Sequence, residues 1–203
     1  IENELDFDFA DFIEKILQKS DLLKKQQHKS VREGLINFMN ERFQSYILDN
    51  KYDVRICDAI FCDDDFVNYY MSLSRIQLLS QFIKKDNGLS LLKAMKRINN
   101  ILDQSLSQNT FGQIDKKIFT SDVENNLYTG IEKLRKKKPK SNDITEIKKY
   151  LSDVSILAEP INDFFENIIV NDEDKNIRAN RFFLLSSVID LTSNIFDISK
   201  IEL

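Results

Sequence analysis

Apolar residues recur at three- and four-residue steps along nearly the whole chain, whereas strict apolar–polar alternation is scarce. Steps of three and four place side chains on one face of an α-helix, while alternation is the pattern of a half-buried strand. The sequence holds only 4 glycines and 2 prolines, too few for the turns of a β-sandwich or barrel or for a glycine-rich phosphate loop. The spacing therefore predicts an all-α fold, and the lack of a fixed-period repeat argues against a solenoid.

The composition is that of a folded protein. Among 203 residues, 42% are hydrophobic and 15 are phenylalanines, enough to close a core in one domain or in two sub-bundles. No apolar run approaches the ~20 residues that cross a bilayer, so we predict no membrane segment. The chain opens without a methionine or a secretion signal, and we expect it to be a piece of a longer protein with a natural C-terminal end.

Start and stop signals divide the chain into helices. Ser30-Val31-Arg32-Glu33 has the spacing of a capping box and is expected to open a long helix, while Asp53 is expected to cap a short one. Asn87-Gly88 reads as a stop signal, and the acidic run 171–174 as the entry to the last helix. The remaining helices are expected near residues 8–25, 63–87, 90–106, 121–137, 143–158 and 161–169. The residues that the spacing places on buried faces include Phe12, Ile13, Ile16 and Leu17 of the first helix, Leu35, Phe38 and Ile47 of the second, and Leu91, Met95 and Ile98 of the helix at 90–106.

Two divisions of the chain are expected. Residues 1–29 form a helical lead-in from a preceding domain, and residues 30–203 form the main helical domain. Within the latter, the polar stretch 105–112 is the best candidate for a boundary between sub-bundles.

The sequence contains no constellation of catalytic or metal-binding residues. Cys57 and Cys62 are expected to be small buried side chains in a reducing cytosol, and His28 is the only histidine. Asp63-Asp64-Asp65 fits a helix start better than a divalent-cation site, because no calcium-loop pattern follows it. We therefore predict that the chain binds no metal ion. A free-standing hydrolase is an improbable alternative, because a nucleophilic serine or cysteine needs a base and His28 is the only histidine.

The net charge of −4 argues against indiscriminate binding of nucleic acid. This charge is unevenly distributed, however. Between residues 132 and 149, eight lysines and arginines face three acidic residues, which gives a local charge of +5. Such a cluster is equally typical of phosphate contacts and of a solvated loop at a helix C-terminus. The candidates for phosphate contact are Arg135, Lys136, Lys137, Lys138 and Lys140.

A second basic group contains Lys93, Lys96, Arg97, Asn99 and Asn100 on one expected helix. Arg97 and Asn100 are three residues apart and therefore neighbours on its surface. Arginine and asparagine side chains suit the edges of bases, but an ordinary polar helix face explains the pattern equally well.

A third group, Arg178, Asn180 and Arg181, follows the acidic run 172–174 by about one helical turn. Arg178 and Arg181 share a helix face. Ion pairing at a helix start is the preferred interpretation, so these residues are expected to be structural.

The last forty residues carry ordered motifs. Residues 159–174 read E-P-I-N-D-F-F-E-N-I-I-V-N-D-E-D, followed by I-R-A-N-R at 177–181 and F-D-I-S at 196–199. This order closely resembles the C-terminal anticodon-binding domain of bacterial glycyl-tRNA synthetase β subunits, with its P-V-D-x-F-F-D-x-V-M-V-N-x-E-D run, its L-R-x-N-R-L motif and its D-I-S ending. Segments 38–43, 52–60 and 96–102 resemble further motifs of that family, so the resemblance covers most of residues 30–203.

The wider family is the helical anticodon-binding bundle of arginyl-tRNA synthetases, named after a D-A-L-R tetrad. Here the corresponding residues are Lys175-Asn176-Ile177-Arg178, so only the arginine is retained. The resemblance implies an all-α, arginyl-tRNA synthetase-like bundle that does not itself catalyse a reaction.

The resemblance also implies partners and a location. In that family the α subunit binds glycine, ATP and Mg, while the β subunit recognises tRNA, so no cofactor is expected in this part of the chain. The expected partners are tRNA-Gly, the α subunit and the rest of the β subunit, in the cytoplasm. Arg75, Lys96, Arg97 and Asn100 are expected to form one RNA-contact surface, and residues 135–140 a second. The alternative is a helical protein–protein scaffold, whose sign would be a large exposed apolar patch.

Overall fold

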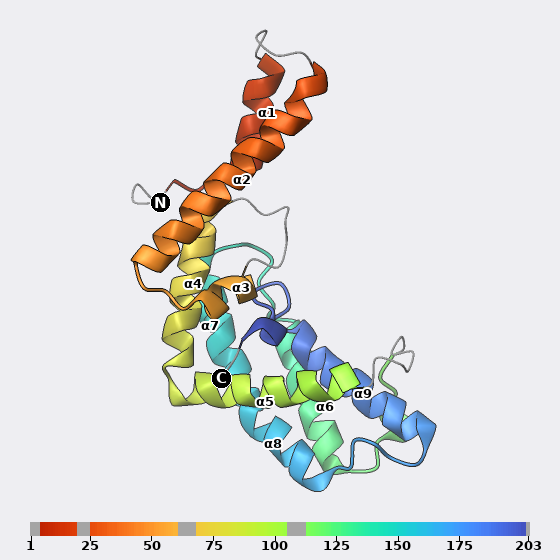
Figure 1. Cartoon of the computed structure of the whole chain (residues 1–203). Helices are drawn as coiled ribbons and strands as arrows, with labels where there is room; N and C mark the ends of the chain where they lie inside the picture. Colours follow the sequence, from red (N-terminus) through yellow and green to blue (C-terminus); the bar gives the residue numbers. More distant parts are fainter. Residues whose placement is uncertain (1–4, 20–24, 61–67, 105–112, 202–203) are drawn as a thin grey trace. The chain divides into compact units, whose positions relative to one another are not determined.

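The computed structural model describes residues 5–19, 25–60, 68–104 and 113–201. Every regular element in these ranges is an α-helix or a short 3-10 helix, so the all-α prediction is confirmed (Figure 1). The chain forms two compact units, residues 1–80 and 81–203, and the division falls inside helix α4 (Tyr69–Ile83). None of the helices in the described ranges is both long and apolar enough to cross a membrane.

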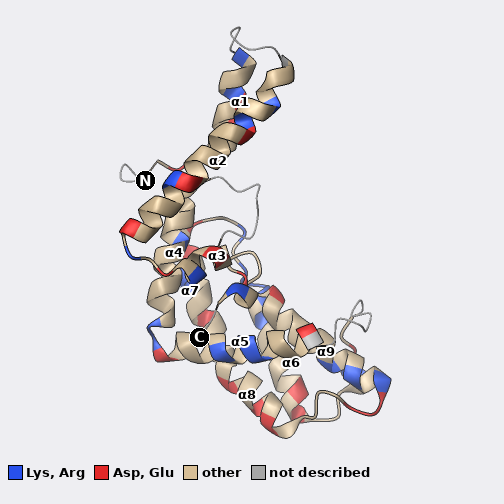
Figure 2. Cartoon of the chain, viewed as in Figure 1, with Lys and Arg blue, Asp and Glu red and all other residues tan. Residues whose placement is uncertain are grey.

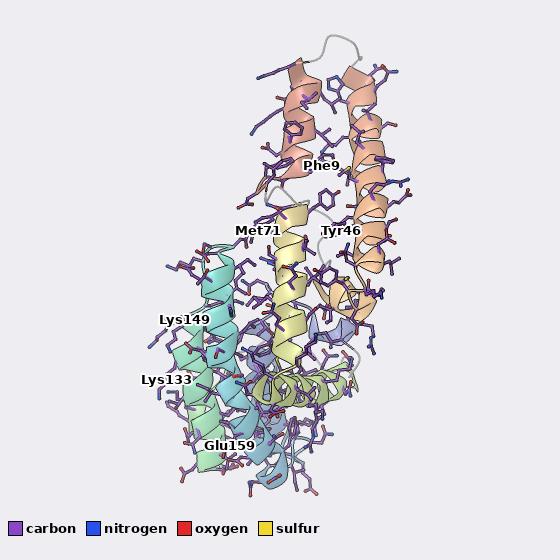
Figure 3. All side chains as sticks on the ribbon, turned by 90° about the vertical axis from the view of Figure 1, so that its left-hand side faces the viewer. Phe9, Tyr46, Met71, Lys133, Lys149 and Glu159 are labelled. Atoms are coloured by element: carbon purple, nitrogen blue, oxygen red, sulfur yellow. The ribbon has the colours of Figure 1, made fainter. Side chains whose placement is uncertain are left out.

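The first unit is built around a helical hairpin. It contains α1 (Phe9–Lys19), α2 (Lys25–Asp49), α3 (Val54–Ile60) and most of α4. α1 packs beside α2, and Figure 3 labels Phe9 on α1, Tyr46 on α2 and Met71 on α4. The ring of Tyr69 lies 5.8 Å from that of Phe9 and 5.2 Å from that of Phe43. Burial raises the pKa of Tyr69 to about 12, so its hydroxyl stays protonated and donates to Asn40 Oδ1 at 2.8 Å.

Part of the predicted apolar face of this hairpin is exposed. Ile13 and Leu17 are buried as predicted, and α2 buries Phe43 and Ile47. Four further residues that the spacing placed inward are instead exposed. They are Phe12, Ile16, Leu35 and Phe38. Only a few helices pack together in this small unit, so a wide apolar stripe is covered only in part.

The second unit holds the larger core. Its α-helices are α5 (Asp86–Gln104), α6 (Asp122–Arg135), α7 (Ile144–Val154), α8 (Ala158–Asn167) and α9 (Lys175–Asp190). Short 3-10 helices are η1 (Lys116–Ile118), η2 (Ser155–Leu157) and η3 (Ile198–Lys200). α5 packs against α8 and α9, and α6 packs against α7, α8 and α9. Leu91, Met95 and Ile98 of α5 are fully buried, as their spacing predicted.

The helix starts predicted at Asp143 and at the acidic run 171–174 are confirmed, but the start predicted at Ser30 is not. Asp143 Oδ1 accepts from Thr145 N at 2.6 Å, and Asp174 Oδ1 accepts from Asn176 N at 2.7 Å. The capping box predicted at Ser30 is wrong, because α2 already begins at Lys25 and Ser30 lies inside it. The motif acts only where the chain enters a helix. It does so at α6, where Ser121 and Glu124 form a capping box.

Asn87-Gly88 does not end a helix, contrary to the prediction. α4 ends at Ile83, and both residues lie in the first turn of α5. A Cβ on Gly88 would lie 2.1 Å from the carbonyl oxygen of Phe82. Gly88 therefore allows the close approach of two backbone segments at this helix–helix turn.

Replacing Gly88 with alanine should lower the free energy of unfolding by about 1–3 kcal/mol, because backbone must move to admit the methyl group. The matched control is Gly34→Ala in α2, where a Cβ meets nothing within 4 Å. That change should raise stability by about 0.5–1 kcal/mol, as helical glycine-to-alanine changes do. Urea unfolding followed by circular dichroism measures both, and equal effects would contradict the close approach at Gly88.

The division between the compact units falls inside α4, whereas the predicted divisions lie at residues 29–30 and within 105–112. Residue 30 lies within α2, which packs against α1, so a boundary at residues 29–30 would cut through one helix of the hairpin. The stretch 105–112 lies outside the described residues, but α5 before it packs on α8 and α9 after it. Polar composition marks exposed chain, whereas compact units depend on contacts between helices distant in sequence.

Candidate nucleic-acid interface

Three polar side chains form an exposed stripe along α5. Lys93, Arg97 and Asn100 are separated by four and three residues, so they lie on one face of the helix, and all three are exposed. We call them the α5 stripe. Figure 2 shows basic residues on α5, whereas α8, which packs against it, carries acidic ones. The stripe combines a flexible cation, a planar guanidinium and an amide, three groups that bind phosphates and base edges.

Arg97 of the stripe lies against an aromatic ring. Its guanidinium carbon is 4.1 Å from the centre of the Phe165 ring, which belongs to α8 and is half-buried. A guanidinium over a ring face at this distance gains cation–π attraction and loses rotational freedom before any ligand arrives. Phe165 could not be predicted as a site residue from sequence, because only the packing of α8 against α5 brings it beside Arg97.

Lys96 is less available than its exposed neighbours. The side chain is half-buried, and its Nζ donates to the carbonyl oxygen of Ser199 at 3.1 Å. This bond ties α5 to η3 near the end of the chain. Asn99, predicted on the same polar face, donates to Asp103 at 2.9 Å.

Arg75 lies on α4 in the first unit, whereas Lys96, Arg97 and Asn100 lie in the second. Its side chain is half-buried, and burial lowers the pKa of its guanidinium. A single surface shared by Arg75 and the α5 residues stays a prediction.

The basic segment follows α6 and leads into α7. Arg135 pairs with Glu132 one turn earlier in α6, and Lys136 is exposed at the end of that helix. Lys137, Lys138 and Lys140 line a pocket of about 500 Å³ together with residues of α7. Of the five residues predicted to contact phosphates in this segment, three line the pocket, whereas Arg135 and Lys136 do not.

Arg181 is the centre of a buried network in the second unit. Its side chain is 6% exposed and that of Glu124 only 1%. Arg181 Nε donates to Glu124 Oε1 at 3.0 Å, and Nη1 donates to Asp172 Oδ2 at 2.7 Å. The remaining donors reach Ile169 O at 2.8 Å and Thr120 Oγ1 at 2.9 Å. This arginine joins α9 to α6 and to the acidic run, and it is shielded from solutes.

Arg178 and Asn180 also bind within the unit. Arg178 Nη1 donates to the carbonyl oxygen of Asp172 at 2.9 Å. The amide of Asn180 pairs with the backbone of Asp115, accepting from its N–H at 2.8 Å and donating to its carbonyl at 3.0 Å. Together these side chains fix the entry to α9, and they are not part of an exposed binding surface.

Acid should weaken this network. The pKa of the Asp172 carboxyl lies below its usual range, first because the backbone N–H of Asp174 donates to it and also because Arg181 does. A pKa lower in the folded than in the unfolded chain stabilises the fold above about pH 4, and that contribution is lost as pH falls further. We expect Asp172→Asn to flatten the fall in urea midpoint between about pH 5 and pH 3. Parallel curves for variant and wild type would contradict this role.

Cys57 and the candidate metal ligands complete the comparison of the predicted site residues with the structure. Burial raises the pKa of the Cys57 thiol to about 11, so it stays protonated as a small buried side chain, as predicted. No group of three or more His, Cys, Asp or Glu side chains able to hold a metal ion occurs within the described part of the chain. Cys62 and Asp63-Asp64-Asp65 lie outside the described residues.

The chain is similar in sequence to known proteins of the family that its motifs resemble. The family model for the DALR anticodon binding domain matches residues 91–203. Glycine–tRNA ligase β subunits of Rickettsia africae and Rickettsia prowazekii are 29% and 30% identical over 202 and 197 residues, which is 99% and 97% of this chain. The chain spans only 28% and 27% of the length of these two relatives. The resemblance predicted from the ordered motifs is confirmed.

Proposed function

Because the chain belongs to the DALR anticodon-binding domain family, we propose that it recognises the anticodon stem-loop of a tRNA. The names of its relatives point to tRNA-Gly, so the chain would act within a glycine–tRNA ligase β subunit. In that setting it supports ATP-dependent glycylation of tRNA in the cytoplasm. Catalysis, with glycine, ATP and Mg, belongs to the α subunit, and this part of the β subunit is non-catalytic.

The observation that carries the proposal is the α5 stripe with Arg97 held against Phe165. The stripe lies within the residues that match the family model. RNA loops are recognised through unstacked bases that stack on aromatic rings or guanidinium groups and through bonds to their edges. Arg97 supplies a guanidinium that is restrained on one side by a ring, and Asn100 supplies both a donor and an acceptor one turn away.

The other basic groups would act on the RNA backbone. Lys93 is exposed at one end of the α5 stripe and would neutralise a phosphate there. Lys96 would reach RNA only by giving up its bond to Ser199 O. We therefore assign base recognition to Arg97 and Asn100, and positioning on the backbone to lysines.

A footprint on a complete tRNA-Gly transcript tests this function. The chain should protect riboses of the anticodon stem and loop from hydroxyl radicals and leave the acceptor stem unprotected. Protection centred on the acceptor stem would contradict anticodon recognition, as would no protection at moderate salt.

A protein–protein scaffold is the second candidate, and exposed apolar side chains favour it. Ile16 of α1 is 50% exposed and Phe38 of α2 is 51% exposed. Large apolar side chains at such positions are typical of surfaces that dock on another protein. These residues lie in the first unit, whereas the α5 stripe lies in the second, so the two roles are compatible. A chain that protects no nucleotide of tRNA would leave the scaffold as the better account.

A further inference from the structure

The pocket beside the basic loop is lined by one face of α7. Glu146, Lys149, Tyr150 and Asp153 line it, and their spacing of three, one and three residues places them on one side of the helix. The loop after α6 forms the opposite wall with Lys137, Lys138 and Lys140. We call this the lysine pocket. Its four lysines exceed its two acids, so it carries a net charge of +2 inside a chain of net charge −4.

Two of the four lysines are held by the protein itself. Lys137 Nζ pairs with Asp153 Oδ2 at 3.0 Å. Lys138 Nζ donates to the carbonyl oxygen of Asp190, at the C-terminal end of α9. Cations are favoured at that end of a helix, where carbonyl groups lack partners. These lysines shape the pocket, and they are not the groups that would contact a ligand.

The polar groups between the lysines are also engaged. Tyr150 Oη donates to Leu191 O at 3.2 Å, and burial raises the pKa of this phenol to about 12, so it remains a donor at neutral pH. Glu146 Oε2 accepts from the Ser141 hydroxyl at 2.9 Å. The tyrosine ring therefore forms a fixed wall of the pocket.

Lys140 and Lys149 are the other two lysines that line the pocket. Both side chains are exposed, and neither has a hydrogen-bond or ion-pair partner among the residues that the structure describes. Lys140 comes from the loop and Lys149 from α7, so two different segments supply them to one pocket. Two unpaired ammonium groups that line one pocket favour an anion, because neither must leave a partner to bind it.

We propose that the lysine pocket binds phosphodiester groups of the RNA strand through Lys140 and Lys149. This inference rests on the proposed function, and it adds a second, sequence-independent contact to the base-reading α5 stripe. An RNA backbone fits better than a free small molecule, because small-ligand sites enclose most of their ligand and these lysines are exposed. Backbone contacts carry no sequence information, so they raise the affinity for every RNA equally.

The test compares two double variants of the whole chain. Lys140→Gln with Lys149→Gln removes the unpaired lysines of the pocket. Lys133→Gln with Lys148→Gln is the matched control, since both lysines are exposed and belong to the same basic segment, but neither lines the pocket. Both change the net charge equally, and circular dichroism verifies that each remains folded. The probe is a fluorescent tRNA-Gly anticodon stem-loop, titrated between about 50 and 300 mM salt, the range where counterion release is measurable.

The pocket variant should bind about fifteenfold more weakly near 0.15 M salt, as loss of two phosphate contacts gives. The slope of log K against log salt should fall by about 1.4–1.8, while the control changes affinity less than about threefold. An unchanged affinity and slope for the pocket variant would overturn the inference, as would an equal loss in the control.

The same titration with an anticodon-substituted hairpin separates this inference from the proposed function. The pocket variant should weaken the binding of both hairpins equally, which preserves the ratio of affinities. If wild type binds both hairpins equally but loses affinity through the pocket variant, anticodon recognition fails and the backbone site stands. If wild type discriminates and the pocket variant binds like wild type, the backbone site fails and anticodon recognition stands. If wild type binds neither hairpin at moderate salt, both fail.

Discussion

Replacing Arg181 with leucine should lower the free energy of unfolding by about 3–5 kcal/mol, because it leaves the carboxylate of Glu124 buried without its charge partner. Glu124 is only 1% exposed, so water cannot replace the guanidinium. Asp172, Thr120 and the carbonyl of Ile169 would each lose a donor as well. Urea unfolding followed by circular dichroism measures the change.

Two further variants show that burial is the cause. Arg135→Leu removes an arginine from the exposed pair with Glu132 and should cost less than about 1 kcal/mol. Adding Glu124→Gln to Arg181→Leu should recover part of the lost stability, since the uncompensated charge is then gone while an amide oxygen can still accept from the backbone at the start of α6. A loss for Arg181→Leu as small as that for Arg135→Leu would show that the network does not hold the unit together.

Replacing Arg97 with alanine should weaken the binding of the cognate anticodon stem-loop about tenfold or more, the effect of losing one stacked base. It should also reduce discrimination against an anticodon-substituted hairpin, because the guanidinium is assigned to base edges, and hydrogen bonds to those edges distinguish one base from another. Lys93→Ala, on the same stripe, is the matched control. It should cost about fourfold at 0.15 M salt with both hairpins, as one phosphate contact would.

A third variant tests the pairing of Arg97 with its ring. Phe165→Ala keeps the guanidinium but removes the surface 4.1 Å away that restrains it. Affinity should fall in the same direction as for Arg97→Ala and by a smaller factor. Equal losses for Arg97→Ala and Lys93→Ala, with unchanged discrimination, would assign Arg97 to the backbone and not to bases.

Local features of the fold could be predicted from sequence. The spacing of Leu91, Met95 and Ile98 placed them correctly in the core, because a helix repeats its burial every three to four residues. The start of the last helix followed from the charge and capping ability of its acidic entry. These signals act within one or two turns of chain.

Features that depend on contacts between distant segments could not be predicted. Asn87-Gly88 resembles a helix stop, yet the glycine serves the close approach of Phe82. Phe38 has the spacing of a core residue, but its exposure depends on which helices pack against α2. Sequence spacing does not say how many neighbours a helix has.

The candidate site shows the same limit. Arg97 and Asn100 were found because they are neighbours on one helix. Phe165 was not, since it reaches Arg97 only through the packing of α8 on α5. Counting charge revealed the basic segment, but only the hydrogen bonds of Lys137 and Lys138 distinguish lysines held by the protein from those available to a ligand.

The most direct test of anticodon recognition is the ratio of two dissociation constants at about 0.15 M salt, measured for the wild-type chain by fluorescence anisotropy. One is for the anticodon stem-loop of tRNA-Gly, and the other for the same hairpin with its anticodon bases replaced. Bidentate hydrogen bonds to base edges are each worth about 1–3 kcal/mol of discrimination, so two such contacts should make the cognate hairpin bind at least about tenfold more tightly. Equal constants for the two hairpins would contradict the account.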